Sequence, residues 1–549
     1  MKIDRRKALA LLGLSAAAPA AAGGPGVSFR HGVASGDPTQ TKVVLWTRIT
    51  PDRAGDEVPY TWELLPIDRR AGGVKRGVGV TGPDRDYTVK VDATGLDAGR
   101  AYTFRFESGG VISSEGRTRT LPAGATKDVV MAVASCALYP NGYFNAYQAI
   151  ADLPRVDLVV HLGDYIYEYG GPGSYGMDSA VAKERPHDPP HEIVSLADYR
   201  RRHAQYRTDP GLQAASARAP WVVSWDDHET ANDSFAGGAQ NHDPKDEGEW
   251  NVRKAVALKA YYEWMPIREP APGVGLAEAS MRSFRIGDLA QLIMIETRLT
   301  ARDQQLNLQR DLPKVDGRPD VAAFNAKLND PDRRMMSPRQ AAWVAAEAAR
   351  SVKAGHAWQV LGNQVIMARV RPFSPKAVLT PEQYAAIPER NRARVQAAEE
   401  NAALGLPTTL DMWEGYPADR ERLCGVLKGA GARPIVLAGD AHSFWANELH
   451  DAKGAYVACE FGTTGITSPG AGEIAPGVDY GVALAKANPE VVFNDQVHQG
   501  FVLLTLTREA ARADMVAVST IISKDFETRT VKSFRTIPEG KGLSKLKET

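Results

Sequence analysis

Five apolar, strand-like runs in this sequence each end on a side chain that can bind a metal ion. The runs are DVVMAVASC, VDLVVHLGD, WVVSWDDHE, WQVLGN and RPIVLAGDAH, and their endings carry Cys136, Asp164, Asp227 with His228, Asn363, and Asp440 with His442. Buried strands of an α/β sheet bring such endings to one edge, where these folds bind ligands. The pattern predicts an enzyme that holds more than one metal ion.

The types of ligand divide into two sets. Asp164, Asp227, Asn363 and Asp440 offer oxygen, which suits a hard cation such as calcium, magnesium or manganese. Cys136, Tyr167 and His442 offer a thiolate, a phenolate and an imidazole, and ferric iron suits that mixture better than zinc. Asp164 is the best candidate for a carboxylate that bridges two ions.

Two metal ions about 3.5–4 Å apart are the usual machinery for in-line displacement at phosphorus. The predicted reaction is attack by metal-bound hydroxide on a phosphate ester. His228 follows the ligand Asp227 directly, and a histidine there can stabilise the transition state or protonate the leaving alkoxide.

Each strand ending also has a purely structural explanation. Asp and Asn are common in turns and helix caps, and an isolated cysteine is usually a small buried apolar residue. We give Cys424 and Cys459 that structural interpretation, because nothing in the sequence connects them with the other endings. Five endings in one chain favour a shared metal site, since the structural explanation would have to hold at each of them separately.

Composition narrows the class of protein. The chain has 549 residues, with 66 basic and 66 acidic side chains, so it lacks the positive charge of a nucleic-acid-binding protein. Residues 1–26 place Arg5 and Arg6 before a short Ala-rich apolar stretch, which is typical of a twin-arginine export signal. The apolar stretch is too short for a membrane span. We therefore expect twin-arginine export to the periplasm or the extracellular space, and a monomer without a transmembrane segment.

The pattern of elements predicts an α/β (α+β) protein with layered sheets flanked by helices and an N-terminal β domain. Residues 27–122 resemble an immunoglobulin or fibronectin type III sandwich, residues 123–535 a catalytic domain, and residues 536–549 a C-terminal tail, either a lid or frayed. Apolar periodicity predicts helices at 143–153, 196–207, 252–265 and 338–355, and a strand at 289–298. Residues 168–195 and 301–338 read as irregular insertions. Residues 397–417 are uninformative, although they can border the cleft.

Eight segments, in order along the chain, resemble the PhoD-type alkaline phosphatase and phosphodiesterase family. They are GVASGDPTQTKVVLWTR, ASCALYPNGYFNAY, DLVVHLGDYIYEYG, LADYRRRHAQYRTDP, WDDHETAND, QVLGNQVIMA, VLAGDAHSFWANEL and EFGTTGITSPG. The resemblance implies an exported, calcium- and iron-dependent metallophosphoesterase whose core is similar to that of purple acid phosphatases. It also implies that Cys136, Asp164, Tyr167 and His442 hold Fe³⁺, and that Asp164, Asp227, Asn363 and Asp440 hold Ca²⁺. His228 takes the position of the catalytic histidine.

We therefore expect hydrolysis of phosphate mono- and diesters. Two alternatives stay open: a phospholipase D-like enzyme acting on lipid headgroups, favoured if Tyr169, Tyr175 and Trp413 surround the cleft, and a non-catalytic binding protein with structural metals. Arg298 is a candidate phosphate contact, and a structural ion pair with Glu296 is the other interpretation of it.

Overall fold

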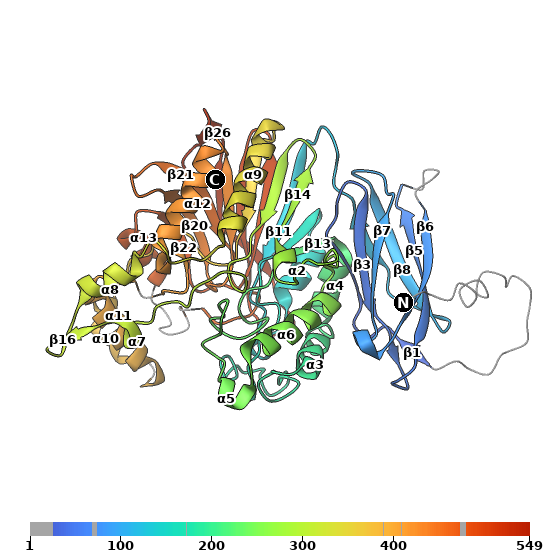
Figure 1. The fold of residues 1–549 in the computed structure, drawn as a ribbon, viewed down its shortest axis with the longest axis horizontal. Coiled ribbons are helices and arrows are strands. Elements are labelled where there is room, and N and C mark those ends of the chain that lie inside the picture. Colours follow the sequence, from blue (N-terminus) through green and yellow to red (C-terminus); the bar gives the residue numbers. More distant parts are fainter. Residues whose placement is uncertain are drawn as a thin grey trace, which may run out of the picture.

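Two β-sheets packed face to face form the centre of the computed structural model (Figure 1). The structure describes residues 26–549 apart from 69–73, 172, 388, 408, 471 and 473–478. The predicted export signal at 1–26 therefore lies outside the described residues, except for its last residue. Within the described part of the chain, no helix is long and apolar enough to cross a membrane.

The first sheet has ten strands, with three parallel neighbours at its middle. These are β11 (Asp128–Ala134), β12 (Leu158–His161) and β13 (Trp221–Val223), and Ala134 lies opposite His161. On the other side of β11, β23 (Gly500–Thr507) pairs antiparallel, followed by β24 (Ala511–Val518) and β25 (Thr528–Thr536). The three parallel strands end at one edge, and the first three predicted ligand segments begin there.

The second sheet has seven strands, in the order β14-β15-β18-β19-β21-β20-β22. β15 (Ala290–Met294), β18 (Trp358–Gly362), β19 (Pro434–Ala438) and β21 (Tyr456–Gly462) are parallel, whereas β14 (Arg282–Ile286), β20 (Phe444–His450) and β22 (Val491–Asp495) pair antiparallel. Asn363 directly follows β18 and Asp440 follows β19. Both sheets therefore contribute strand ends to the candidate site.

Strands of the first sheet are apolar on both faces because both faces are covered. Val133 and Val160 pack into the core between the sheets, whereas Ala132, Ala134 and Val159 pack against helices. The helices on that side include α2 (Asn145–Asp152), α3 (Leu196–Tyr206), α4 (Pro210–Arg218) and α6 (Trp250–Trp264). α9 (Pro338–Lys353) and α12 (Pro417–Gly429) cover the second sheet (Figure 1).

The mixed α/β core with flanking helices is as the sequence predicts. The four predicted helices are confirmed as α2, α3, α6 and α9, and the strand predicted at 289–298 is confirmed as β15.

Part of the N-terminal β domain belongs to the ten-stranded sheet of the core. β5 (Val58–Pro66), β6 (Lys75–Thr81), β8 (Ala101–Ser108) and β10 (Gly116–Arg119) pack against β2 (Val33–Gly36), β3 (Lys42–Arg48) and β7 (Thr88–Thr94). Gly36 of β2 pairs with Trp221 of β13, so this second layer continues into the ten-stranded sheet. A Cβ atom at Gly36 would lie 2.2 Å from the Pro266 carbonyl oxygen, and only glycine fits the junction. The immunoglobulin or fibronectin type III identity stays a prediction.

Of the two segments predicted to be irregular, one differs from its predicted form. Residues 168–195 contain no helix or strand among the described positions, as predicted. Residues 301–338 were expected to be irregular, and this was wrong in part, because they include α7 (Leu308–Asp311) and α8 (Val321–Leu328). Asn307 and Asp320 cap these helices, and Phe324 packs in a small separate core with Leu406. That core joins distant segments, which local periodicity does not reveal.

The C-terminal residues 536–549 are not a frayed tail. β26 (Pro538–Glu539) pairs with β27 (Gly542–Leu543), and β28 (Lys547–Glu548) pairs with β25 at the edge of the ten-stranded sheet. The Lys545 ammonium group also contacts the Glu448 carboxylate at 2.6 Å.

The Asp37 side chain connects the N-terminal sheets to the core. Its buried carboxylate accepts hydrogen bonds from the Arg282 guanidinium and from the Arg268 backbone N–H at 2.7 Å. Asp37→Ala should lower the free energy of unfolding by about 3 kcal/mol, because it leaves a largely buried guanidinium unpaired. Urea unfolding measures the change. Asp56→Ala, in an exposed loop, is the control and should stay within about 0.5 kcal/mol of wild type. An equal effect of both substitutions would contradict the role of Asp37.

Candidate metal centre

Four of the predicted ligand residues have a left-handed backbone. The φ angles are 61° at Cys136, 55° at Asp164, 62° at Asp440 and 50° at His442. This conformation is uncommon for residues with a side chain, and it concentrates at functional sites whose surroundings hold it in place. Here it turns the chain sharply where the strands end and brings the side chains of both sheets together.

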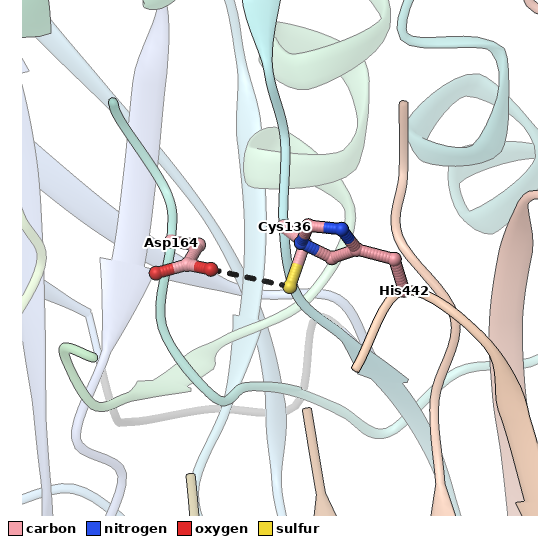
Figure 2. A group of neighbouring side chains, drawn as sticks. All are labelled: Cys136, Asp164 and His442. Carbon is pink, nitrogen blue, oxygen red and sulfur yellow. Dashed lines mark hydrogen bonds between the residues drawn. The ribbon is translucent and has the colours of Figure 1, made fainter. Parts of the chain in front are cut away.

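The first predicted ligand set meets around the Asp164 carboxylate. Asp164 Oδ2 lies 3.4 Å from Cys136 Sγ and 3.3 Å from Tyr167 Oη, and Tyr167 Oη lies 3.3 Å from His442 Nε2. Figure 2 shows the side chains of Cys136, Asp164 and His442 converging from separate segments. These residues are far apart in sequence, so the fold alone creates the group.

Three residues of the second predicted set, Asp164, Asp227 and Asp440, meet in a second group. The carboxylates of Asp164, Asp226, Asp227 and Asp440 all lie within 4.8 Å of one another. Asn363 is fully buried at the end of β18, and its side-chain oxygen accepts a hydrogen bond from Trp413 Nε1 at 3.1 Å. Asp164 therefore belongs to both the mixed-ligand group and the oxygen-only group.

Three acidic residues of the site were missed from the sequence. Asp226 joins the oxygen-only group, and Asp233 and Asp411 form a further acidic group with Asp227. Asp233 follows the WDDHE motif closely, so its proximity in sequence was an available signal. Asp411 lies in the segment 397–417, whose sequence gives no such indication.

The unpaired negative charge of the centre fits a site for cations. Asp164 Oδ1 and Asp226 Oδ2 are buried, and neither has a hydrogen-bond partner among the described residues. Burial, together with nearby carboxylates, raises the pKa of Asp164 and of Asp440 well above its usual range. Burial likewise raises the pKa of the Cys136 thiol and the Tyr167 hydroxyl, with Asp164 adding to both. Metal ions would supply the missing positive charge and favour the ionised ligands.

His228 is held by a buried carboxylate that the sequence did not reveal. His228 Nδ1 lies 2.7 Å from Glu168 Oε2, and Glu168 Oε1 accepts hydrogen bonds from Asn232 N at 2.7 Å and Asn241 Nδ2 at 2.8 Å. Burial alone would raise the pKa of Glu168, but the interaction with His228 and these donors lower it overall. An ionised carboxylate only accepts hydrogen bonds, so His228 Nδ1 carries a proton. For His228, burial opposes the charged form, but Asp227 and Glu168 outweigh it and raise the pKa.

Arg298 lies among the acidic residues. Its buried side chain donates from Nε to Asp226 Oδ1 at 2.5 Å and from Nη1 to Asp411 Oδ1 at 2.8 Å. It is not among the residues that line the main pocket described below. Glu296 accepts a hydrogen bond from the backbone N–H of Arg298 at 2.8 Å instead of forming the expected ion pair with its guanidinium. Arg298 therefore neutralises carboxylates of the acidic groups, and its contact with phosphate stays a prediction.

A second buried carboxylate fixes the two strand ends that supply the acidic ligands. Glu229 accepts hydrogen bonds from the backbone N–H groups of Asp164 at 3.0 Å, Tyr165 at 2.5 Å and Asp226 at 2.8 Å. Burial raises the pKa of Glu229 to about 7 despite these donors. The sequence does not predict this role of Glu229, because nothing local indicates that one side chain spans two loops.

The centre opens into a cavity of about 1250 Å³, called the main pocket here. Residues of the centre that line it include Asp227, His228, Asp440 and His442. Tyr169 and Tyr175 also line it, whereas Trp413 is fully buried beneath Asn363 and does not. The site therefore has an accessible acidic floor and an aromatic wall.

Comparisons with known proteins agree with this geometry. The sequence model of the family described as PhoD-like phosphatase matches residues 131–515, and that of its N-terminal domain matches residues 15–122. Alkaline phosphatase D of Bacillus subtilis (strain 168) is 34% identical over 536 residues, which cover 95% of this chain and 83% of that protein. A solved structure described as the structure of PhoD is 31% identical and superposes with a TM-score of 0.77, covering 97% of this chain and 94% of the other. The chain belongs to the PhoD-like phosphatase family and is a phosphoric ester hydrolase.

Proposed function

We propose that this protein hydrolyses phosphate mono- and diesters at a binuclear metal centre. The observation that carries the proposal is the position of Asp164, which belongs to a mixed-ligand group and to an oxygen-only group at once. A shared carboxylate is the arrangement by which two ions are held close enough to act on one phosphate group. The similarity to alkaline phosphatase D supports the class of reaction.

The donor types support Fe³⁺ in one group and Ca²⁺ in the other. Fe³⁺ would be held by Cys136, Asp164, Tyr167 and His442, and Ca²⁺ by Asp164, Asp227, Asn363 and Asp440. When bound, such ions neutralise phosphate oxygens and lower the pKa of a coordinated water. Asp226 lies in the same oxygen-only group, but its Oδ1 is held by Arg298.

The protein residues orient the proton transfer. Because Glu168 holds the Nδ1 proton of His228, the ring is fixed, and Nε2, which lies 4.0 Å from Asp227 Oδ1, is the nitrogen that would face the substrate. His228 lines the main pocket, and its raised pKa keeps a proton available at Nε2. We therefore assign His228 the donation of this proton to the leaving alkoxide as water attacks phosphorus from the opposite side.

The proposed place of action is the periplasm or the extracellular space. Its support is the twin-arginine pattern in residues 1–26, and the proposed role is the release of inorganic phosphate from esters.

A lipid phosphodiesterase is the second candidate function. Tyr169 and Tyr175 line the main pocket, which supports an apolar substrate group, whereas the buried Trp413 does not contribute. A purely binding role has less support, because it does not require the oriented pair of His228 and Glu168.

Metal removal tests the proposed function directly. Purified protein should hydrolyse bis(p-nitrophenyl) phosphate, lose that activity with EGTA and regain it when calcium is added. The physical reason is that the oxygen-only group suits calcium. Release of p-nitrophenol and metal analysis by mass spectrometry are the measurements. Inactivity of a metal-replete sample towards both this diester and p-nitrophenyl phosphate would refute the proposal.

Substitution separates the proton donor from the residue that orients it. His228→Ala should lower kcat by about 10²–10⁴-fold, and Glu168→Gln by about 10–100-fold, with metal content unchanged in both. Both losses should be larger for alkyl than for p-nitrophenyl leaving groups, because alkoxides need a proton more. Glu184→Gln, an exposed carboxylate of the same insertion, is the matched control and should keep wild-type activity. Unchanged turnover in His228→Ala would contradict the role assigned to this histidine.

Metal-free protein should lose stability as pH rises. Burial raises the pKa of Glu229 from 4.5 to about 7 and that of Asp233 from 3.8 to about 7. The folded state then keeps protons that the unfolded state releases, so the free energy of unfolding falls between about pH 4 and 7. The Tm of chelator-treated protein should fall from about pH 5 to about pH 7.5, and more steeply than that of metal-loaded protein.

Glu460 provides an internal reference for this titration. Its pKa is also raised to about 7 by burial, but it binds backbone N–H groups of Met367 and Ala368 outside the acidic groups of the centre. Glu460 should contribute the same pH dependence to metal-free and metal-loaded protein. The difference between the two slopes of Tm against pH therefore reports the acidic groups of the centre. Identical slopes with and without metal would contradict the predicted charge imbalance.

A further inference from the structure

A second cavity, called the side pocket here, lies beside the main pocket and has a volume of about 350 Å³. Four residues line both cavities: Val370, Thr409, Leu484 and Gln496. The side pocket therefore adjoins the main pocket, which also contains residues of the metal centre. Its volume falls within the range of small-molecule sites.

The interior of the side pocket is apolar. Phe373, Val395, Ala398 and Tyr480 line it, and the Phe373 and Tyr480 rings lie 6.1 Å apart between centroids. Among the described residues that line it, Arg371 is the only charged one. The adjoining main pocket contains the proposed metal centre, whose ions would attract a phosphate group, so the two cavities together match a ligand with one phosphate end and one apolar end.

Hydrogen bonds connect the segments that form the walls of the side pocket. The Asn488 side chain accepts a hydrogen bond from the backbone N–H of Arg371 at 2.6 Å and donates one to its carbonyl oxygen at 3.1 Å. Glu399 on α11 (Glu389–Leu404) accepts from Ser374 Oγ at 2.7 Å and from Lys376 N at 3.1 Å. These contacts attach the segment 370–376 to α11 and to the end of α13 (Tyr480–Ala487). The pocket is thus built into the fold.

Apolar side chains also surround the mouth of the main pocket. Val497 and Ile522 line it while remaining 59% and 56% exposed. Exposed apolar groups beside a binding cavity are typical of surfaces that receive apolar ligands.

We propose that the side pocket binds the apolar alcohol group of a phosphodiester whose phosphate lies at the metal centre. The ligand class is a phosphodiester with an alkyl or aryl arm. The proposal rests on the proposed phosphoesterase function and adds substrate selection to it. The side pocket contributes binding, because burial of each methylene group removes apolar surface from water.

A chain-length series tests the proposal. The probes are p-nitrophenyl alkyl phosphates from methyl to octyl, used with metal-loaded full-length protein below the concentration at which they aggregate. Wild-type kcat/KM should rise by up to about fourfold per buried methylene and then level off when the side pocket is full. Ala398→Phe, which fills the pocket, should lower the octyl-to-methyl ratio of kcat/KM by about tenfold or more.

Two further variants serve as a surface control and as a second test of the side pocket. Ala393→Phe places the same ring on the exposed face of α11 and should keep the wild-type ratio. Phe373→Ala removes one wall and should also lower the ratio, which covers the case in which Ala398→Phe does not fold. Hydrolysis of the methyl ester without any dependence on chain length would overturn the side pocket alone. A chain-length dependence that neither pocket variant changes would do the same. No hydrolysis of any ester would instead overturn the proposed function.

Discussion

The excess of buried negative charge where the two sheets meet is the constraint on which the rest of the structure depends. Six carboxylates gather there: Asp164, Asp226, Asp227, Asp233, Asp411 and Asp440. Among the described residues, three side chains form ion pairs with these carboxylates: the guanidinium groups of Arg298 and Arg302, and the imidazole of His228 when it is protonated. Like charges at such distances repel strongly in a buried site. A fold that keeps these carboxylates together must fix the position of each backbone segment that carries one and must bind cations that offset their charge.

Buried carboxylates that accept hydrogen bonds from backbone N–H groups hold these segments in place. Glu229 joins the loops after β12 and β13, and Glu296 binds the N–H groups of Arg298 and Leu299 at 2.8 and 2.7 Å. Glu460 does the same beyond Asn363. Each of these carboxylates satisfies several donors, and Glu229 thereby holds the backbone of the left-handed ligand residue Asp164 before any ion binds. Such preorganisation is what electrostatic catalysis requires.

The sequence predicted the parts of this centre that follow from local pattern. Apolar runs identified the strands, and the residues after them identified seven ligand candidates, because a strand ending is a local feature. Glu168 and Glu229 escaped, since their roles depend on contacts with Asn241 and with two separate loops. Arg298 was identified as a candidate, but its acidic partners could not be predicted, because they come from other segments. The helices inside 301–338 escaped for the same reason: their small core includes Leu406.

The pairing order of the ten-stranded sheet has a consequence for how the chain matures on the ribosome. β11 lies between β12, its near neighbour in sequence, and β23, so that Val133 pairs with both Val160 and Val502. During synthesis, β11 keeps one unpaired edge until residues 500–507 have emerged. Closing so long a loop is slow, and an open apolar edge is prone to aggregate. All residues up to β23 must therefore be made before the strand that precedes Cys136 has both partners, and a nascent chain is expected to need protection until then.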